Sequence, residues 1–105
     1  MTGGAGGLGR AITARLRADG FRVASADIGV PAGDDADAAI QVDVTDPDSA
    51  AAMCARVLDR WGRVDVLVNN AGIAGPTAPV ASYPPDAWHQ VIAVNLIGVF
   101  HCTRA

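Results

Sequence analysis

Lysine and glutamate are absent from this chain of 105 residues, so its positive charges are 8 arginines and its negative charges 11 aspartates. The net charge of −3 is spread along the chain without a basic stripe, which argues against a nucleic acid as a partner. No apolar run approaches the roughly 20 residues that a membrane span needs, and no charged leader with a hydrophobic stretch precedes the glycine-rich opening. We therefore expect a cytoplasmic protein that does not bind a membrane.

Cysteine and histidine are also scarce. Cys54 and Cys102 fall on separate predicted helices, which favours two small buried hydrophobic residues over a disulfide or a metal pair. His89 and His101 have no ligand-like spacing with them, so we expect no metal site. Half of the residues are apolar, and a chain of this length and composition is expected to fold as a single domain over residues 1–105.

Glycine, by contrast, is concentrated at the amino end, in the stretch TGGAGGLG of residues 2–9. Such a run before a helical pattern is typical of a strand-to-helix turn whose N–H groups lie against a pyrophosphate. One glycine allows the tight turn, one lets the ligand approach and one lets the helix pack on the sheet. Gly4, Gly6 and Gly9 fit GxGxxG, which alone is weak, and a flexible glycine-rich terminus is the alternative.

Hydrophobic periodicity predicts alternating helices and strands. The predicted elements are a helix over residues 7–18, strands over 21–28 and 38–45, a helix over 46–62, a nearly all-apolar strand over 63–68 and a helix over 85–105, with loops at 29–38 and 73–85. This order predicts an α/β fold with a doubly wound parallel sheet in three α/β/α layers and a ligand across the carboxyl ends of the strands. The last helix is apolar on more than half of its surface, which indicates that a second subunit or another helix covers it.

Four motifs occur in order along the chain. The first, TGxxxGxG, comprises Thr2, Gly3, Gly7 and Gly9, and the others are Asp43-Val44, Asn69-Asn70-Ala71-Gly72 and Asn95 within VNLIGVF. Together they resemble the short-chain dehydrogenase/reductase family, and the resemblance covers essentially the whole chain. It implies a Rossmann-like fold, a nicotinamide cofactor, and hydride transfer between that cofactor and an alcohol or ketone.

Asp27 closes the strand that follows the glycine turn, about 20 residues on, where a carboxylate can accept hydrogen bonds from the adenosine ribose. A solvated strand-end aspartate is the alternative. Two like charges about 4 Å apart repel by roughly 4 kcal/mol at an effective dielectric of 20, so Asp27 disfavours a 2′-phosphate. Family members that prefer NADP commonly carry a basic residue in the glycine turn, where Gly6 stands. We therefore expect NAD rather than NADP.

The resemblance also implies roles for individual residues. It assigns cofactor binding to Gly3, Gly6, Gly7, Leu8, Gly9, Asp27, Ile28, Asp43, Val44, Asn70, Ala71, Gly72 and Val94. By this resemblance Asp43 and Val44 flank the adenine, and Asn70 to Gly72 lie beside its ribose; an ordinary strand end and a plain turn are the alternatives. Asn95 is the asparagine of the family's catalytic tetrad and holds a water, or else is an asparagine that faces solvent.

The resemblance also shows what these residues do not include. The family has an apolar strand ahead of TGxxxGxG, and without it the centre of the sheet has two unpaired edges. The family's serine and YxxxK motif normally lie beyond the last helix, and Tyr83 has no lysine after it. We therefore expect an N-terminal fragment, inactive by itself, with Met1 a misread start, from a parent that is a homo-oligomer through the last helix. A non-catalytic nucleotide-binding or protein-interaction module is the alternative.

Overall fold

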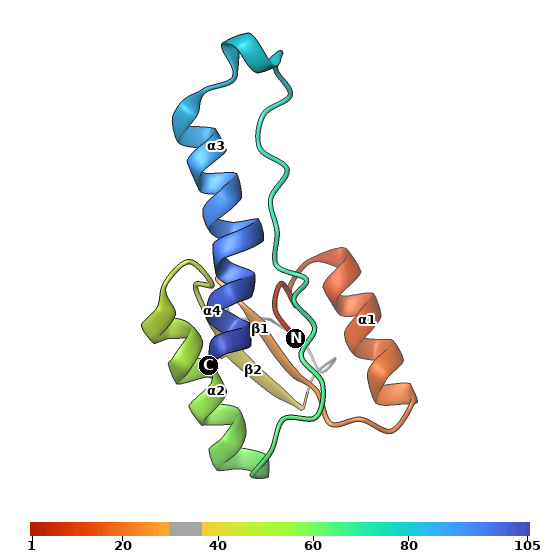
Figure 1. Cartoon of the computed structure of the whole chain (residues 1–105). Coiled ribbons are helices and arrows are strands. Elements are labelled where there is room, and N and C mark those ends of the chain that lie inside the picture. Colours follow the sequence, from red (N-terminus) through yellow and green to blue (C-terminus); the bar gives the residue numbers. More distant parts are fainter. Residues whose placement is uncertain (30–36) are drawn as a thin grey trace.

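The structure is a computed structural model that describes residues 1–29 and 37–105. In order, its elements are α1 (Gly7–Ala18), β1 (Ala24–Asp27), β2 (Ala38–Gln41), α2 (Pro47–Trp61), the 3-10 turn η1 (Val80–Ser82), α3 (Pro85–Ile92), the π-helical segment η2 (Ala93–Ile97) and α4 (Gly98–Arg104) (Figure 1). The predicted helices are confirmed, and the last contains a π segment that periodicity did not indicate. The loop predicted over residues 29–38 lies mostly outside the described residues.

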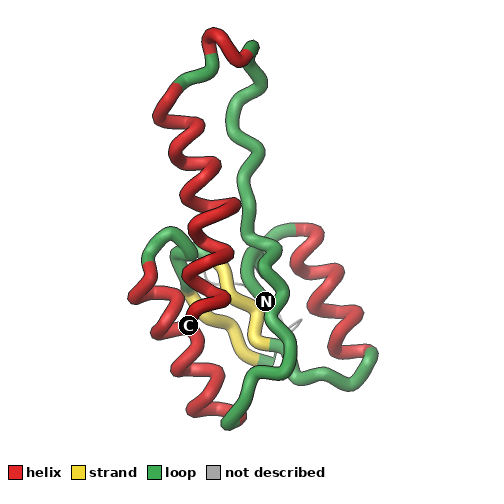
Figure 2. The backbone as a smooth tube through the Cα atoms, viewed as in Figure 1, coloured by secondary structure: helices red, strands yellow, loops and turns green. Residues whose placement is uncertain are grey.

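The centre of the fold is a two-stranded parallel sheet in which Ala24 pairs with Ala38 and Asp27 with Gln41. Helices α2 and α4 cover one face of this sheet, and α1 lies on its other side (Figures 1 and 2). The core is built by both strands, the residues just after β2, and the inward sides of α2 and α4. Its buried members are Ala24, Ala26, Ile40, Val42, Val44, Ala50, Met53 and Cys102.

Helix α2 begins and ends where the sequence predicts. The Asp46 side chain accepts a hydrogen bond from the Asp48 N–H at 3.0 Å, and Pro47 occupies the first turn, which stabilises a helix start. Gly62 ends the helix in the left-handed region, with φ of 76°, which favours glycine. Cys54 on this helix and Cys102 on α4 are both free, and Cys102 is buried as predicted while Cys54 is half-buried.

Helix α1 forms over the predicted residues, but its most buried positions are not those of the apolar stripe. Ile12 and Leu16 of that stripe are half-buried, whereas Leu8 is 69% exposed. The buried residues of α1 are Gly9 and Thr13. The helix packs through small residues because a Cβ at position 9 would collide with the carbonyl oxygen of Gly3.

The strand predicted over residues 63–68 is absent, so this prediction was wrong. These residues are extended but form no strand, and Val64 and Val66 are 48% and 53% exposed. A strand requires a neighbour to bond with. Among the described residues, one backbone bond reaches this segment, from the Thr2 N–H to the Val68 carbonyl at 3.0 Å. For the same reason the sheet has two strands rather than three.

A groove with a cavity volume of about 140 Å³ separates β1 from residues 63–68. Its walls include the apolar residues Leu16, Phe21, Val23, Val57, Trp61, Val64, Val66 and Val68, beside charged residues such as Arg22 and Asp65. Met1 closes one end, where its amino group donates to the Ala24 carbonyl and its own carbonyl accepts from the Ala26 N–H, both at 2.8 Å. Burial lowers the pKa of the Met1 amino group from 8.0.

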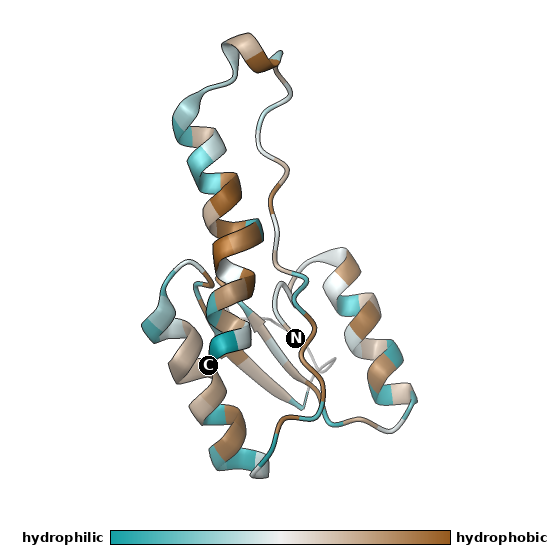
Figure 3. Cartoon of the chain, viewed as in Figure 1, coloured by the Kyte–Doolittle hydropathy of each residue, from teal (hydrophilic) through white to brown (hydrophobic). Residues whose placement is uncertain are grey.

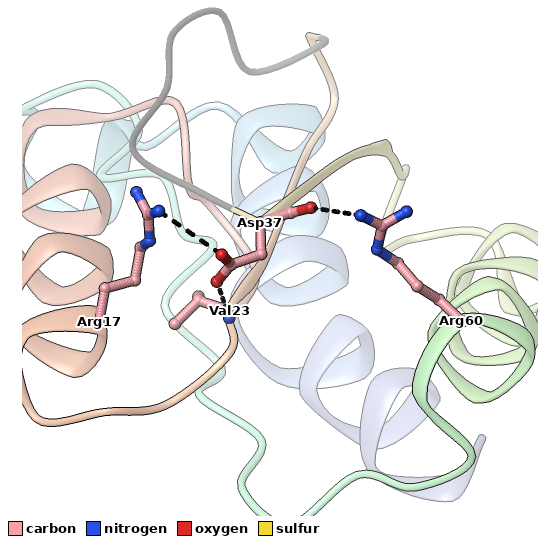
Figure 4. Close-up of polar contacts among 4 residues, drawn as sticks. All are labelled: Arg17, Val23, Asp37 and Arg60. Carbon is pink, nitrogen blue, oxygen red and sulfur yellow. Dashed lines mark hydrogen bonds and ion pairs between the residues drawn. The ribbon is translucent and has the colours of Figure 1, made fainter.

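Asp37 ties the sheet to two helices at the amino ends of the strands (Figure 4). One carboxylate oxygen accepts from the Val23 N–H at 2.7 Å, and the other lies 3.5 Å from the Arg17 guanidinium of α1. The Asp37 backbone carbonyl accepts from Arg60 of α2 at 3.1 Å. Asp37 therefore fixes the register at which β1 and β2 begin.

Residues 73–97 form an arm that projects from the rest of the molecule (Figure 1). The longest dimension of the whole molecule is 47 Å. The helix formed by α3, η2 and α4 has hydrophobic residues along much of its length (Figure 3). Its large apolar side chains include Leu96 at 63% and Phe100 at 59% exposure. The wide apolar face predicted for this helix is thus confirmed. Within the described residues, the helices lack the combination of length and hydrophobicity that crossing a bilayer demands.

Appending an apolar strand of about five residues ahead of Met1 is expected to stabilise the fold. The added strand fills the groove and pairs with both exposed edges, so we expect the melting temperature to rise by at least about 5 °C, and the amides of Val64 to Val68 to become protected from hydrogen exchange. A glycine- and serine-rich extension of equal length is the control. Equal stabilisation by both extensions would contradict the explanation by strand pairing.

Stability should also depend on the Met1 amino group. Its pKa is lowered on folding, so the unfolded chain binds more protons and the free energy of unfolding rises with pH up to about 8. In the chains with the apolar extension and with the glycine- and serine-rich extension, the nitrogen of Met1 is part of a peptide bond and carries no charge. We expect the rise in stability between about pH 7 and pH 8, measured by urea denaturation, to disappear in both of them.

Asp37→Ala is expected to lower the free energy of unfolding by about 1 kcal/mol, since the Val23 N–H loses a charged acceptor at a partly exposed site. Asp37→Asn keeps an acceptor oxygen, so its free energy of unfolding should fall by less than that of Asp37→Ala. Asp59→Ala, on the exposed side of α2, is the control. Urea denaturation measures all three, and an Asp37→Ala protein as stable as the control would refute this role for Asp37.

Candidate functional site

A cavity of about 540 Å³ opens at the carboxyl ends of β1 and β2. The glycine turn, the residues after each strand, the segment after Val68 and the helical arm form its wall. Its lining includes every residue to which the resemblance assigned cofactor binding, from Gly3 to Val94. Residues that lie as far as 91 positions apart in sequence (94 − 3) thus converge on one space.

The glycine turn has three distinct local environments. Gly3 has φ of 67°, and a Cβ there would lie 2.7 Å from the Asn70 amide nitrogen. Gly9 lies against Gly3, so that α1 can start close to the turn. Gly7 faces open space, because a Cβ at this position would have no neighbouring atom within 4 Å. The first N–H groups of α1, at the cavity, have no partner within the helix.

Thr2 joins the glycine turn to the segment after Val68. Its side chain is almost fully buried, and its hydroxyl accepts from the N–H groups of Asn70 and Ala71, both at 3.2 Å. The Asn70 amide in turn donates to the carbonyls of Thr2 and Gly3, at 3.1 and 3.0 Å. These four bonds hold two sides of the cavity together.

Two carboxylates stand on the cavity wall. Asp27 Oδ2 accepts from the Ala5 N–H at 2.9 Å, which links the end of β1 to the glycine turn. Asp43 Oδ1 accepts from the Thr45 hydroxyl at 2.7 Å and from the Thr45 N–H at 2.9 Å. These bonds, first from the hydroxyl and then from the backbone, lower the pKa of Asp43. Asp43 is therefore ionised at neutral pH.

Asn95 does not line the cavity. Its carboxamide pairs with the backbone of Ile73, accepting from the N–H and donating to the carbonyl, both at 2.9 Å. The residue is exposed, yet its side chain is fully engaged. Asn95 lies in the π segment η2, and π segments occur frequently at functional sites. In this structure Asn95 fixes the segment that begins at Ile73 against the π segment η2.

Three residues of the cavity wall, Val42, Ile73 and Gln90, were not predicted. Val42 directly precedes the Asp43-Val44 motif, and Ile73 directly follows Gly72. Gln90 lies four residues before Val94, which places both on one side of a helix. Adjacency and helical spacing were therefore available signals for all three residues.

The sequence of the whole chain, residues 1–105, matches the family model described as short chain dehydrogenase. This chain belongs to the short-chain dehydrogenase family. It is 39% identical to the 2-dehydro-3-deoxy-L-rhamnonate dehydrogenase (NAD(+)) of Sphingomonas sp. (strain SKA58), in a match that covers 99% of this chain and 44% of that protein. It is 43% identical to the cis-4-hydroxycyclohexanecarboxylate dehydrogenase of Sinomonas cyclohexanicum, over 99% of this chain and 45% of that protein.

The fold is also that of the short-chain dehydrogenases. The crystal structure of 3-ketoacyl-(acyl-carrier-protein) reductase from Brucella melitensis complexed with NADH superposes with a TM-score of 0.90 at 30% identity, covering 98% of this chain and 46% of the reductase. The predicted Rossmann-like α/β class is therefore confirmed, with a sheet that is incomplete. This short-chain dehydrogenase sequence spans less than half the length of the two relatives named above.

Asn95→Ala is expected to lower the free energy of unfolding by about 1 kcal/mol, because both polar groups of Ile73 lose their partner at an exposed site. The Ile73 amide should exchange with solvent faster as a result. Asn69→Ala, which removes one 3.3 Å contact to Thr103, is the matched control. Unchanged exchange at Ile73 would show that the carboxamide does not hold this segment.

Proposed function

We propose that this chain is the cofactor-binding part of a nicotinamide-dependent oxidoreductase, and that the cavity holds NAD. The observation that carries the proposal is the convergence of the glycine turn, Asp27 and the segment Asn70 to Gly72 on one cavity at the carboxyl ends of parallel strands. Ligands of open α/β sheets bind at this position. The names of a dehydrogenase relative, with NAD(+), and of a structural neighbour, with NADH, support a nicotinamide cofactor.

The residues present fit a dinucleotide. At Gly7 an added Cβ would meet no protein atom within 4 Å, and at Gly6 it would meet only the Gly3 carbonyl at 3.6 Å. The wall is therefore open where a diphosphate has to approach the backbone. The amino end of α1 supplies unpaired N–H groups and the positive end of the helix dipole, which favour an anion.

Asp27 supports NAD over NADP. It lies on the cavity wall, and its negative charge attracts ribose hydroxyls but repels a 2′-phosphate. The glycine turn, residues 2–9, contains no basic residue that could neutralise that phosphate. Val42, Asp43 and Val44 line the neighbouring part of the cavity, where we place the adenine.

When bound, NAD accepts a hydride from an alcohol, or its reduced form donates one to a ketone. The role of these residues is to bind and orient the cofactor and to keep water from its buried side. We propose that Asn95 acts in catalysis by placing the segment at Ile73. The family's Tyr-x-x-x-Lys pair is not among these residues, since lysine is absent and Tyr83 packs edge-on against Trp88. We therefore expect no turnover by this chain alone.

The exposed apolar face of the long helix supports a homo-oligomer of the whole protein. Leu96, Ile97 and Phe100 share this face and are all exposed, and uncovered apolar patches mark interaction sites. A cytoplasmic location belongs to the same proposal, supported by two cysteines that are both free.

A non-catalytic nucleotide-binding module is the second candidate. It needs only the cofactor cavity, which is lined by the glycine turn, the ends of the strands and the segment Asn70 to Gly72. The two candidates differ in the longer protein, which turns over an alcohol or ketone in the first and binds NAD without turnover in the second.

NAD is expected to bind this chain at least about tenfold more tightly than NADP, which corresponds to about 1.4 kcal/mol. Gly7→Val should weaken the binding of both cofactors by tenfold or more, since its side chain would overfill the site once the cofactor is bound, which costs about 1–3 kcal/mol. The melting temperature of the free chain should stay nearly unchanged, because a Cβ at Gly7 meets no protein atom within 4 Å. Ala14→Val, on an exposed position of the same helix, is the control. Isothermal titration calorimetry measures each affinity.

Equal affinity for NAD and NADP would overturn the assignment of Asp27. Failure of a folded chain to bind either cofactor would overturn the proposed site itself. If Gly7→Val bound NAD as tightly as the Ala14→Val control, the diphosphate would not lie at the glycine turn.

A further inference from the structure

The glycine turn is anchored to the end of β1 by two bonds from consecutive residues. The Gly4 N–H donates to the Ala26 carbonyl at 3.1 Å, and the Ala5 N–H donates to Asp27 Oδ2 at 2.9 Å. The first is a backbone bond that any residue at position 26 could accept. The second depends on the side chain at position 27. Gly6, the N-cap of α1, adds no side-chain bond of its own.

The anchoring bond at Ala5 is of the stronger kind. Its acceptor is a carboxylate, and hydrogen bonds to charged groups are roughly twice as strong as those between neutral groups. It joins residues 22 positions apart, so it constrains the turn relative to the sheet. For the other oxygen of Asp27, the described part of the chain supplies no hydrogen-bond donor, and Asp27 lies on the cavity wall.

We propose that Asp27 is a positioning residue for the glycine turn as well as the residue that faces the cofactor. Oδ2 holds the Ala5 N–H and sets where the turn lies against the cavity, while the other oxygen stays available to a ribose hydroxyl. The second role rests on the proposed function, but the first does not, because the bond to Ala5 exists without any ligand.

This division has a specific consequence for cofactor choice. Asn at position 27 keeps an oxygen that can accept from Ala5 but carries no charge, whereas Ala keeps neither. Asp27→Asn should therefore lose most of the preference for NAD and still hold the turn. Asp27→Ala should in addition bind both NAD and NADP about fivefold more weakly than Asp27→Asn does, since it loses the hydrogen bond that the neutral amide oxygen of Asn can still accept.

The first experiment needs no cofactor. Hydrogen exchange of the Ala5 amide is followed by NMR in the 105-residue chain, in Asp27→Asn and in Asp27→Ala, with Asp86→Ala as a control at an exposed position of α3. We expect slow exchange in the chain itself, in Asp27→Asn and in the control, and exchange at least about tenfold faster in Asp27→Ala. Equal exchange in Asp27→Ala and Asp27→Asn would overturn the proposal.

The second experiment measures the affinities of the same proteins for NAD and NADP by calorimetry. A lower affinity of Asp27→Ala than of Asp27→Asn for both NAD and NADP is the expected result, and equal affinities of these two variants would overturn the positioning role in binding. If the Ala5 amide responds as expected but no protein binds either cofactor, the proposed function fails while the positioning of the turn stands. Should Asp27→Ala not fold, Asp27→Ser, whose hydroxyl is one atom shorter than the carboxylate, replaces it in both experiments.

Discussion

The buried hydroxyl of Thr2 is the contact on which the rest of the structure depends. It accepts hydrogen bonds from the N–H groups of Asn70 and Ala71, while the backbone around it bonds to Val68 on one side and Ala26 on the other. Residues 1–4 therefore link β1 to the segment after α2. Because both sides of the candidate site meet here, a loss of this junction would separate the glycine turn from the residues it faces.

The short sheet is held at both ends by aspartate carboxylates. Asp37 bonds to the Val23 N–H and faces Arg17 where the strands begin, and Asp27 bonds to the Ala5 N–H where β1 ends. A pair of four-residue strands has little backbone bonding of its own. Side chains at its ends therefore replace part of what a wider sheet supplies, and they place the cavity at the carboxyl end.

The helix formed by α3, η2 and α4 contributes to the site from the opposite side. Gly98 allows α4 to approach Val44, where a Cβ would come within 2.7 Å of the valine side chain, and His101 bonds to the Val44 carbonyl at 3.0 Å. Asn95 then fixes Ile73 beside the cavity. The same helix leaves a row of large apolar side chains uncovered, so one element serves both the cavity wall and a surface suited to association.

The sequence by itself determined the helices and the glycine turn, and its motifs indicated the family and most of the residues that line the cavity. These follow from local rules, such as the cap at Asp46, the left-handed ends at Gly20 and Gly62, and motif order. The tertiary structure alone decided that residues 63–68 form no strand, that α1 packs through Gly9 and Thr13, and that Asn95 bonds to Ile73. Each of these outcomes depends on which backbone or side chain lies alongside, and strand pairing and close packing are relations between distant segments that no local pattern encodes.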